Sequence, residues 1–189
     1  MVPAVPAVRT ERLRLRGWRP EDRASFAAMN TDPAVVEFLP AALTRAESDA
    51  FVDRIEAGWA TYGYGLWAVD VPGVAPFVGY VGLSTAVFEA RFTPAVEVGW
   101  RLARDAWGFG YATEAGRASL RYGFETVGLD EIVSFTAVQN LRSRAVMERL
   151  GLRRDPADDF EHPNVAAGSD LRRHVLYRLD RPTWAAAGG

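Results

Sequence analysis

The sequence predicts an α/β fold in which helices pack against a mixed sheet in a single domain. Three observations carry this prediction. Strand-like and helix-like segments alternate along the 189 residues, two central strand-like runs are joined as a hairpin, and no internal linker is long or polar enough to divide the chain. Residues 9–180 are therefore expected to form the domain, with a flexible tail at 1–8 and a second tail at 181–189.

The N-terminal part of the chain is predicted to contain one strand and then two or three helices. Leucines alternate with arginines over Arg9–Arg16, as in a half-buried strand. The segment 20–29 begins with a proline and two acidic residues, which favour the start of a helix. A short helix is expected over 34–38, and Thr44 with Glu47 forms the capping box of a longer helix.

The middle of the chain is predicted to be a meander of three strands. Two runs, Leu66–Val71 and Phe77–Ser84, are joined by PGVAP, which can turn but cannot continue a strand. A third run, Val96–Leu102, alternates strictly, so another element must cover its apolar face. The opposite face of this run carries Glu97, Gly99 and Arg101.

The C-terminal half is predicted to alternate helices and strands. Over Ala112–Val127, small residues lie on one helical face and charged residues on the other, which suits close packing on a sheet. Ile132–Val138 is an almost uninterrupted apolar run, typical of a central strand. A helix over Asn140–Leu150, ended by Gly151, and a strand over His174–Leu179 complete the order.

Composition excludes several classes of chemistry. The chain has no cysteine, and all 22 of its basic residues are arginine, which excludes a thiolate nucleophile, a Schiff-base lysine and a phosphate-loop lysine. The two histidines, His162 and His174, lie apart in the sequence, so no metal site is expected. The net charge of -2 gives no basic excess, so nucleic acid is not an expected partner.

The N-terminal residues do not resemble a targeting segment. MVPAVPAV has two prolines and no basic residue, unlike a secretory signal peptide. The uncharged stretch 71–88 is cut by prolines and glycines into pieces of strand length. No membrane partner is expected, and the expected location is cytoplasmic.

The stretch WGFGYATEA at 107–115 places two glycines between a predicted strand and a predicted helix. Bare backbone N–H groups at a helix N-terminus favour a bound phosphate group; alternatively, the glycines only permit a turn with positive φ. A dinucleotide fingerprint needs a third glycine where Thr113 lies, and a Walker loop needs a lysine. Neither of these two nucleotide sites fits.

Residues 96–152 resemble the central half of an acetyltransferase of the GNAT superfamily; they read VEVGWRLARDAWGFGYATEAGRASLRYGFETVGLDEIVSFTAVQNLRSRAVMERLGL. TERLRLRGWRPED at 10–22 is similar to the opening strand of the Rim-type branch, which includes the ribosomal-protein N-terminal acetyltransferases. The resemblance covers residues 9–180. It implies a mostly antiparallel mixed sheet with splayed central strands, acetyl-CoA as co-substrate and a primary amine as acceptor, and it leaves a homodimer open.

The resemblance implies where acetyl-CoA binds. The pantetheine arm is expected along the third strand of the meander and the pyrophosphate over the glycine loop, whose first position, Trp107, departs from the Arg or Gln of the superfamily pattern. Asn140 is expected to hydrogen-bond the pantetheine arm or else to act as a helix N-cap. Arg104, Arg142 and Arg144 are available for the nucleotide phosphates or else are solvated. The implied cofactor-binding residues are Trp100, Arg101, Leu102, Trp107, Gly108, Phe109, Gly110, Tyr111, Ala112, Thr113, Asn140 and Arg144.

The resemblance also implies direct attack of the amine on the thioester. Glu97 is the candidate base because it projects from the strand a few residues before the glycine loop; alternatively, it is an exposed carboxylate or a partner of Arg101. Many GNAT enzymes protonate the departing thiolate with a tyrosine, but this chain has Met147 at that position. Ser143 is the candidate acid in its place.

The sequence does not define the acceptor. DPADDFE at 155–161 places four carboxylates near the expected acceptor mouth, where they would attract a cationic amine or else are only solvated. A peptide N-terminus, an aminoglycoside-like amine and a small metabolite all stay open. A CoA-binding sensor without catalysis and a nucleotide-binding module are alternatives, and the missing lysine and third glycine disfavour the second.

Overall fold

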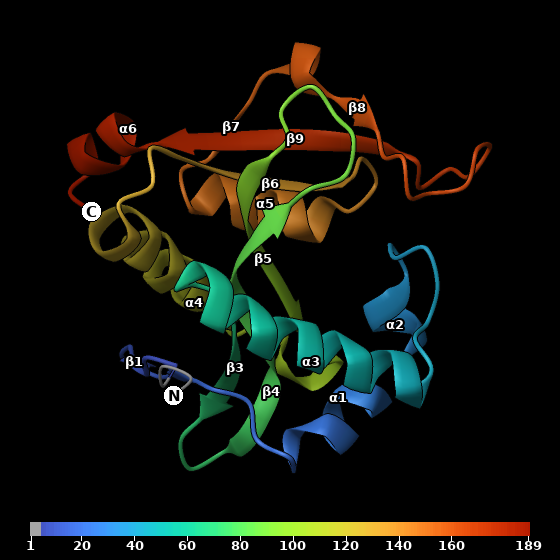
Figure 1. Ribbon diagram of the computed structural model, residues 1–189, viewed down its shortest axis with the longest axis vertical. Helices are drawn as coiled ribbons and strands as arrows, with labels where there is room; N and C mark the ends of the chain where they lie inside the picture. The colour runs from blue at the N-terminus through green and yellow to red at the C-terminus, as the bar shows by residue number, and fades with distance from the viewer. Residues whose placement is uncertain (1–4) are drawn as a thin grey trace.

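One continuous sheet runs through the computed structural model, which describes residues 5–189 (Figure 1). Its strands are β1 (Val8–Arg9), β2 (Arg14–Arg16), β3 (Leu66–Val71), β4 (Ala75–Ala86), β5 (Ala95–Leu102), β6 (Glu131–Ala137), β7 (Arg153–Arg154), β8 (Phe160–Glu161) and β9 (Arg173–Asp180). They pair in the order β1-β2-β3-β4-β5-β6-β9-β7, with β8 on β9. Every pairing is antiparallel except β5 with β6, so the predicted mixed, mostly antiparallel α/β fold is confirmed.

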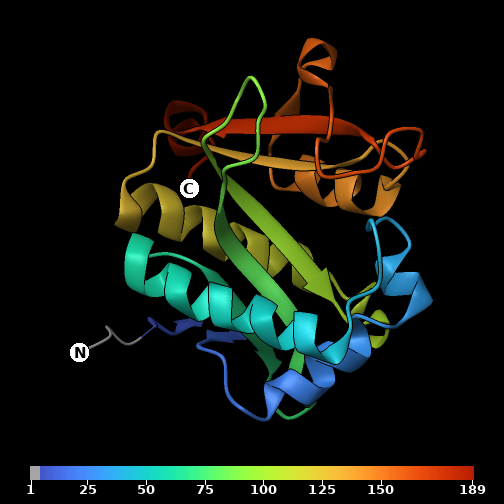
Figure 2. The same ribbon diagram turned by 45° about the vertical axis from the view of Figure 1, so that its right-hand side comes forward.

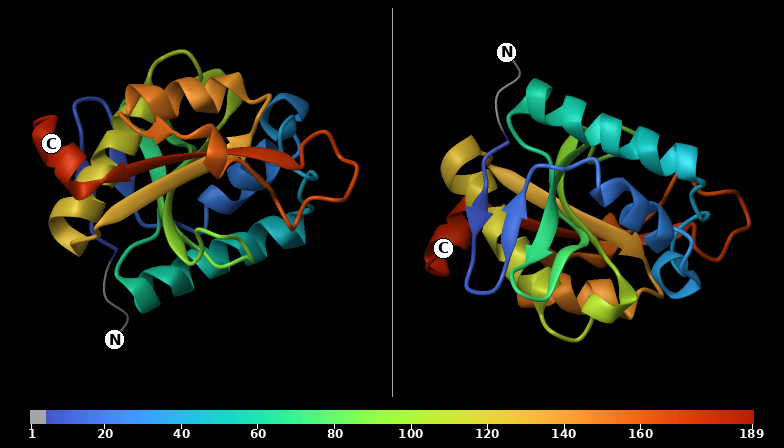
Figure 3. Two further views of the ribbon diagram at one scale, coloured as in Figure 1. Left: turned by 90° about the horizontal axis from the view of Figure 1, so that it is seen from above. Right: turned by 90° about the horizontal axis from the view of Figure 1, so that it is seen from below.

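Helices cover both faces of this sheet. They are α1 (Asp22–Met29), α2 (Pro33–Val36), α3 (Arg45–Tyr62), α4 (Tyr111–Arg121), α5 (Leu141–Arg149) and α6 (Arg181–Ala186). Figure 3 shows the sheet between α1 and α3 on one side and α4 and α5 on the other. Of the helices described, none is both long and apolar enough to cross a lipid bilayer.

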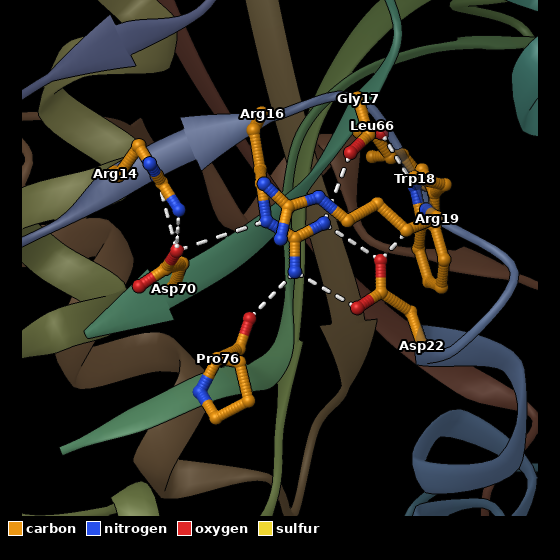
Figure 4. Close-up of polar contacts among 9 residues, drawn as sticks. All are labelled: Arg14, Arg16, Gly17, Trp18, Arg19, Asp22, Leu66, Asp70 and Pro76. Atoms are coloured by element: carbon orange, nitrogen blue, oxygen red, sulfur yellow. Dashed lines mark hydrogen bonds and ion pairs between the residues drawn. The ribbon is translucent and has the colours of Figure 1, made fainter. Parts of the chain in front are cut away.

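The predicted N-terminal strand over Arg9–Arg16 is wrong in its extent. The chain turns where Thr10 N donates to Leu13 O (3.0 Å), and β1 pairs back on β2 as a hairpin. Arg16 was expected on the solvent face, but it is buried because its guanidinium donates to both oxygens of buried Asp22, at 2.7 and 2.8 Å (Figure 4).

The ion pair of Arg16 belongs to a buried polar cluster that joins β2, the start of α1 and the β3–β4 hairpin. Arg16 also donates to Pro76 O (2.5 Å), and its Nε lies 3.8 Å from Asp70 Oδ2. Arg14 pairs with the same Asp70 carboxylate (Figure 4). The cluster therefore fixes the N-terminal strands and α1 against the sheet.

The predicted helices of the chain form, with small changes at their ends. The capping box of α3 is present, with Glu47 N donating to Thr44 Oγ1 (3.2 Å) and Thr44 N to the Glu47 carboxylate (2.8 Å). The helix expected over Ala112–Val127 is α4 followed by a π-helical turn, Tyr122–Val127. Gly123 lies against Ile132 and leaves no room for a Cβ, as the small-residue face predicts.

The two central strands diverge, and the divergence opens the sheet. β5 and β6 pair at one position, Glu97 with Val133. Next to it, Ser134 Oγ donates to Val98 O (2.8 Å) and holds the strands together at their point of separation. Beyond that point the edge of β5 faces a cleft; Figure 2 shows β5 running away from the β6–β9 end of the sheet.

The two ends of the described chain are packed. Pro6 O accepts a hydrogen bond from the indole of Trp67 (2.7 Å), and residues 1–4 of the expected N-terminal tail lie outside the described residues. Of the expected C-terminal tail, residues 181–186 form α6, and its Trp184 is buried and stacks on Phe124.

Candidate active site

A cleft of about 1330 Å³ lies between β5, α4, α5 and the α2 segment. Pockets of about 300–1,000 Å³ hold drug-sized ligands, so this cleft suits a larger one. Of the residues predicted to bind the cofactor, it is lined by Trp100, Arg101, Leu102, Trp107, Gly108, Gly110, Tyr111, Ala112, Thr113 and Asn140.

The free edge of β5 offers backbone hydrogen-bonding groups to the cleft. Ala103 N donates to Val78 O (2.9 Å), so alternate residues of β5 turn their backbone groups toward β4. Trp100 and Leu102 have the opposite orientation and turn theirs toward the cleft, where β6 has already diverged. A linear ligand with amide groups, such as a pantetheine arm, could pair with this edge as an added strand.

The glycine loop before α4 has the backbone that a phosphate-binding loop needs. Gly108 and Gly110 both have φ of +82°, a region that residues with a Cβ rarely adopt. The N–H groups of Tyr111, Ala112 and Thr113 lie in the first turn of α4, where the helix itself offers them no carbonyl acceptor. Within the part of the chain that the structure describes, Gly108 to Gly110 donate no backbone hydrogen bond to another segment.

An arginine that sequence reasoning missed lies on this loop. Arg12 NH1 donates to Phe109 O (2.9 Å), and its NH2 group is 3.5 Å from the position a Cβ of Gly110 would take. The guanidinium is oriented by Glu114, which also accepts from the Thr10 hydroxyl (2.6 Å). Burial alone would raise the pKa of Glu114, but the bonds from Thr10 and Arg12 lower it, so its carboxylate stays ionised and paired.

Trp107, which departs from the superfamily pattern, has a structural role in this chain. Its indole Nε1 donates to Leu102 O (2.8 Å) and so ties the glycine loop to the end of β5. The guanidinium of Arg142 lies 4.7 Å from its ring centroid and 5.4 Å from that of Phe38, and Arg142 also pairs with Glu37 (2.5 Å). The α2 segment is thereby held beside α5, across the cleft from β5 (Figure 2).

A second cavity of about 600 Å³ opens on the face of β5 that carries Glu97, Gly99 and Arg101. Glu97 is half-buried in it, and the Ser84 hydroxyl donates to its carboxylate at 3.4 Å. Burial raises the pKa of Glu97 from 4.5 to about 8, and the weak bond from Ser84 only partly opposes the shift. Such a carboxyl group exchanges protons near neutral pH, as a general base must.

The two cavities meet at the N-terminus of α5. Asn140 caps that helix, accepting from Ser143 N (3.2 Å) while its amide nitrogen donates to Thr136 Oγ1 (3.0 Å) and Ser143 Oγ (3.1 Å). Since the Ser143 oxygen accepts from Asn140, its own hydroxyl proton is free to point into the junction. Met147 is fully buried on the next turn and lines the second cavity.

Several predicted residues lie outside both cavities. Arg144 donates to Val138 O (3.0 Å) beneath α5, so its guanidinium is unavailable to a phosphate in the cleft. Phe109 contributes its backbone to the loop, but its side chain is 57% exposed and stacks on Tyr111. Arg104 lines neither cavity.

No carboxylate of the acidic stretch 155–161 lines the second cavity. Asp158 pairs with Arg178 (2.7 Å), Asp159 with Arg154 (2.5 Å), and Asp155 caps a short turn. The attraction of a cationic amine by these carboxylates stays a prediction, and the lining of the second cavity, which includes none of them, gives it no support.

The two histidines, distant in sequence, come together at the wall of the second cavity. Their rings are 4.9 Å apart within a cluster of phenylalanines. Burial lowers the pKa of His162 to about 4, with His174 and Arg172 adding to the shift, and burial also lowers the pKa of His174. Both imidazoles are therefore neutral near pH 7. Within residues 5–189, no three His, Asp or Glu side chains are arranged to hold a metal ion.

Comparison with known proteins agrees with this geometry. The family model described as "Acetyltransferase (GNAT) domain" matches residues 12–153. The chain is 31% identical over 194 residues to the FsC-acetyl coenzyme A-N(2)-transacetylase of Aspergillus fumigatus, covering 97% of this chain and 80% of that protein. It is 29% identical over 144 residues to the uncharacterized protein YkkB of Bacillus subtilis, covering 76% and 83% of the two chains.

The fold is also similar to that of an acetyltransferase from Agrobacterium tumefaciens known from its crystal structure. The TM-score is 0.75 at 28% sequence identity, and the match covers 95% of this chain and 96% of that one. Splayed central strands beside a glycine loop define an acetyltransferase of the GNAT type, and the chain belongs to the GNAT acetyltransferase family. It is accordingly an acetyl-CoA-dependent acyltransferase.

Proposed function

We propose that this enzyme transfers the acetyl group of acetyl-CoA to a primary amine by direct attack, with Glu97 as the base and Ser143 as the acid. The observation that carries this proposal is the junction of the two cavities where β5 and β6 diverge. The larger cleft suits the cofactor and the smaller cavity suits the amine. The residues common to both are Phe38, Leu39, Trp100, Arg101, Asn140 and Ser143.

The residues of the cleft fit acetyl-CoA. The bare N–H groups of 108–113 at the start of α4 are donors for a pyrophosphate, and Arg12 adds a positive charge beside them. A Cβ built on Gly108 would meet no atom within 4 Å, so the loop is open on that side. Arg117, Arg121 and Arg149 line the outer part of the cleft, where further phosphate charge would be balanced.

Acetyl-CoA supplies an acetyl group that is already activated as a thioester. The chain's own residues therefore need only orient the amine, accept its proton and donate one to the departing sulfur. Glu97 has a pKa near 8, so it can accept a proton directly or through a water molecule. Ser143 lies at the junction with its oxygen already accepting from Asn140, which leaves its proton for the sulfur.

Two finer assignments stay predictions. Membership of the Rim-type branch rests on the opening segment 10–22 and on Ser143. The acceptor is proposed to be a protein N-terminus or a small-molecule amine, because the cavity of about 600 Å³ admits either an extended end of a chain or a small molecule.

A thiol-release assay tests the proposal. We expect acetyl-CoA to release free thiol only when peptides with varied N-termini, amino acids or small amines are added. Ser143→Ala should lower kcat about tenfold or more, whereas Ser25→Ala, at an exposed serine of α1, should leave it unchanged. Unchanged turnover in Ser143→Ala would remove that residue from the mechanism.

A CoA-binding sensor is the second candidate, and buried Met147 in the place of the usual tyrosine favours it. It would show itself as tight binding of acetyl-CoA without thiol release for any amine in the same panel.

A further inference from the structure

The acceptor cavity carries a positive charge that the proposed chemistry does not use. Arg54 and Arg101 both line it, and their guanidinium carbons lie 5.5 and 5.9 Å from the ring centroid of Phe51. Among residues 5–189, neither arginine forms an ion pair. Two unneutralised cations thus face one small cavity.

Arg101 is held in place by a neutral partner. Its NH1 group donates to Asn30 Oδ1 (2.6 Å), Asn30 is fully buried, and the guanidinium lies over the Tyr80 ring at 5.6 Å. These contacts orient the side chain but leave its charge uncompensated. The Arg101 guanidinium is therefore a fixed positive charge in the wall of the cavity.

The strand face between Glu97 and Arg101 is bare. The two residues lie four positions apart on the same face of β5, about 13 Å along a strand, with Gly99 between them. A Cβ on Gly99 would meet only the Glu97 carboxyl group, at 3.5 Å. A small molecule can therefore lie over Gly99 with one end at Glu97 and the other toward the arginines.

The charges of this cavity disfavour a polycationic acceptor. Among the described residues that line it, Glu97 has the only carboxyl group, and with a pKa of about 8 only a minor fraction of it is ionised at pH 7. The histidines of the wall are neutral. The remaining lining is rich in aromatic side chains, including Phe51, Tyr64 and Phe135.

Building on the proposed function, we infer that the acceptor is a small primary amine that also carries a carboxylate on an apolar or aromatic body. Arg54 and Arg101 bind the carboxylate, the aromatic wall packs on the body, and the amine lies toward Glu97. Polyamines and aminoglycosides are then poor acceptors, because they bring only positive charge into the cavity.

Binding of the acetylated product tests this inference independently of turnover. In the presence of CoA, calorimetry should show that 4-(acetamidomethyl)benzoate, whose amide and carboxylate lie at opposite ends of an aromatic ring, binds at least tenfold more tightly than 4-(acetamidomethyl)benzamide, which lacks the negative charge. Arg54→Gln should remove most of that preference. Arg45→Gln changes a second exposed arginine of the same helix, one that pairs with Asp49 outside the cavity, and should retain it.

Equal affinity for the two compounds, an unchanged preference in Arg54→Gln, or no binding of either compound would overturn the inference. The rate assay separates this failure from that of the proposed function. If the acid is preferred in binding but no amine releases thiol, the carboxylate site stands and the acetyl transfer fails. If amines are acetylated but 4-(aminomethyl)benzamide and spermidine are used as well as 4-(aminomethyl)benzoate, the transfer stands and the carboxylate site fails.

Discussion

At the scale of single residues, Glu97, the proposed base, is expected to set the pH dependence of the reaction. Its pKa is raised to about 8, so the carboxylate that accepts a proton is lost as pH falls through this value. We expect kcat/KM to rise from pH 6 to 9 with an inflection near 8. Glu97→Gln should lower kcat by about 10²-fold or more and remove the inflection. An inflection that survives in Glu97→Gln would assign the pKa to the amine instead.

The same variant has a stability signature that tests the raised pKa of Glu97 independently of turnover. Because the pKa of folded Glu97 lies above its ordinary value of 4.5, its contribution to stability is present below pH 4.5 and is lost as pH rises through about 8. Glu97→Gln should therefore be more stable than the parent at pH 8.5, by on the order of 2 kcal/mol after allowance for partial exposure. Thermal unfolding at pH 5 and 8.5 measures the difference.

Individual site residues were predictable from the sequence only where a local pattern, such as strand alternation or a family motif, includes them. Strand alternation placed Glu97 and Arg101 on one face, and the family motif placed Ser143 near the cofactor. Arg12 and Arg54 could not be found in this way, since their positions at the cleft and at the second cavity depend on the fold, as in the contact between Arg12 and Glu114. Long-range pairing leaves no periodic signal in a single sequence.

At the scale of elements, the glycine loop before α4 gives a direct test of cofactor binding. Gly110 has φ of +82°, where a residue with a Cβ costs about 1–2 kcal/mol. Gly110→Ala should relax the loop away from that geometry and raise KM for acetyl-CoA about tenfold, with a smaller change in kcat. Gly73→Ala imposes similar strain (φ +78°) in the β3–β4 turn, outside both cavities, and should leave KM unchanged. Equal KM values for the two variants would contradict a role of the loop in binding the cofactor.

Elements were predictable in proportion to their length. The strand β5 has a clear period of two, β3, β4 and β6 are apolar runs of strand length, the long helices have a period of 3.6 residues, and the capping box placed the start of α3 within a residue. The two-residue strands β1, β7 and β8 have no period to detect, so the break in Arg9–Arg16 and the extra strands on β9 were missed. Their pairing is set by neighbouring strands and not by their own composition.

At the scale of the whole molecule, the sheet brings together two parts of the chain that make different cavities. The segments before β5 supply α3, which lines the smaller cavity, and α2, which lines the larger cleft; the segments after β5 supply the glycine loop to the cleft and α5 to both. The active site therefore exists only where the N-terminal layer is fixed against the central strands. That attachment passes through β2 and α1 (Figure 4).

The buried pair of Arg16 and Asp22 should consequently control global stability. Asp22→Asn leaves the Arg16 guanidinium buried with its main counter-charge removed, which typically costs about 3–5 kcal/mol. Replacing both residues by apolar ones, Arg16→Met with Asp22→Leu, should cost less, because no unpaired charge remains in the interior. Arg45→Gln breaks an exposed ion pair and should change the free energy of unfolding by less than about 0.5 kcal/mol. Urea unfolding of the three variants measures this order, and a loss in Asp22→Asn no larger than in Arg45→Gln would show that the cluster does not anchor the N-terminal layer.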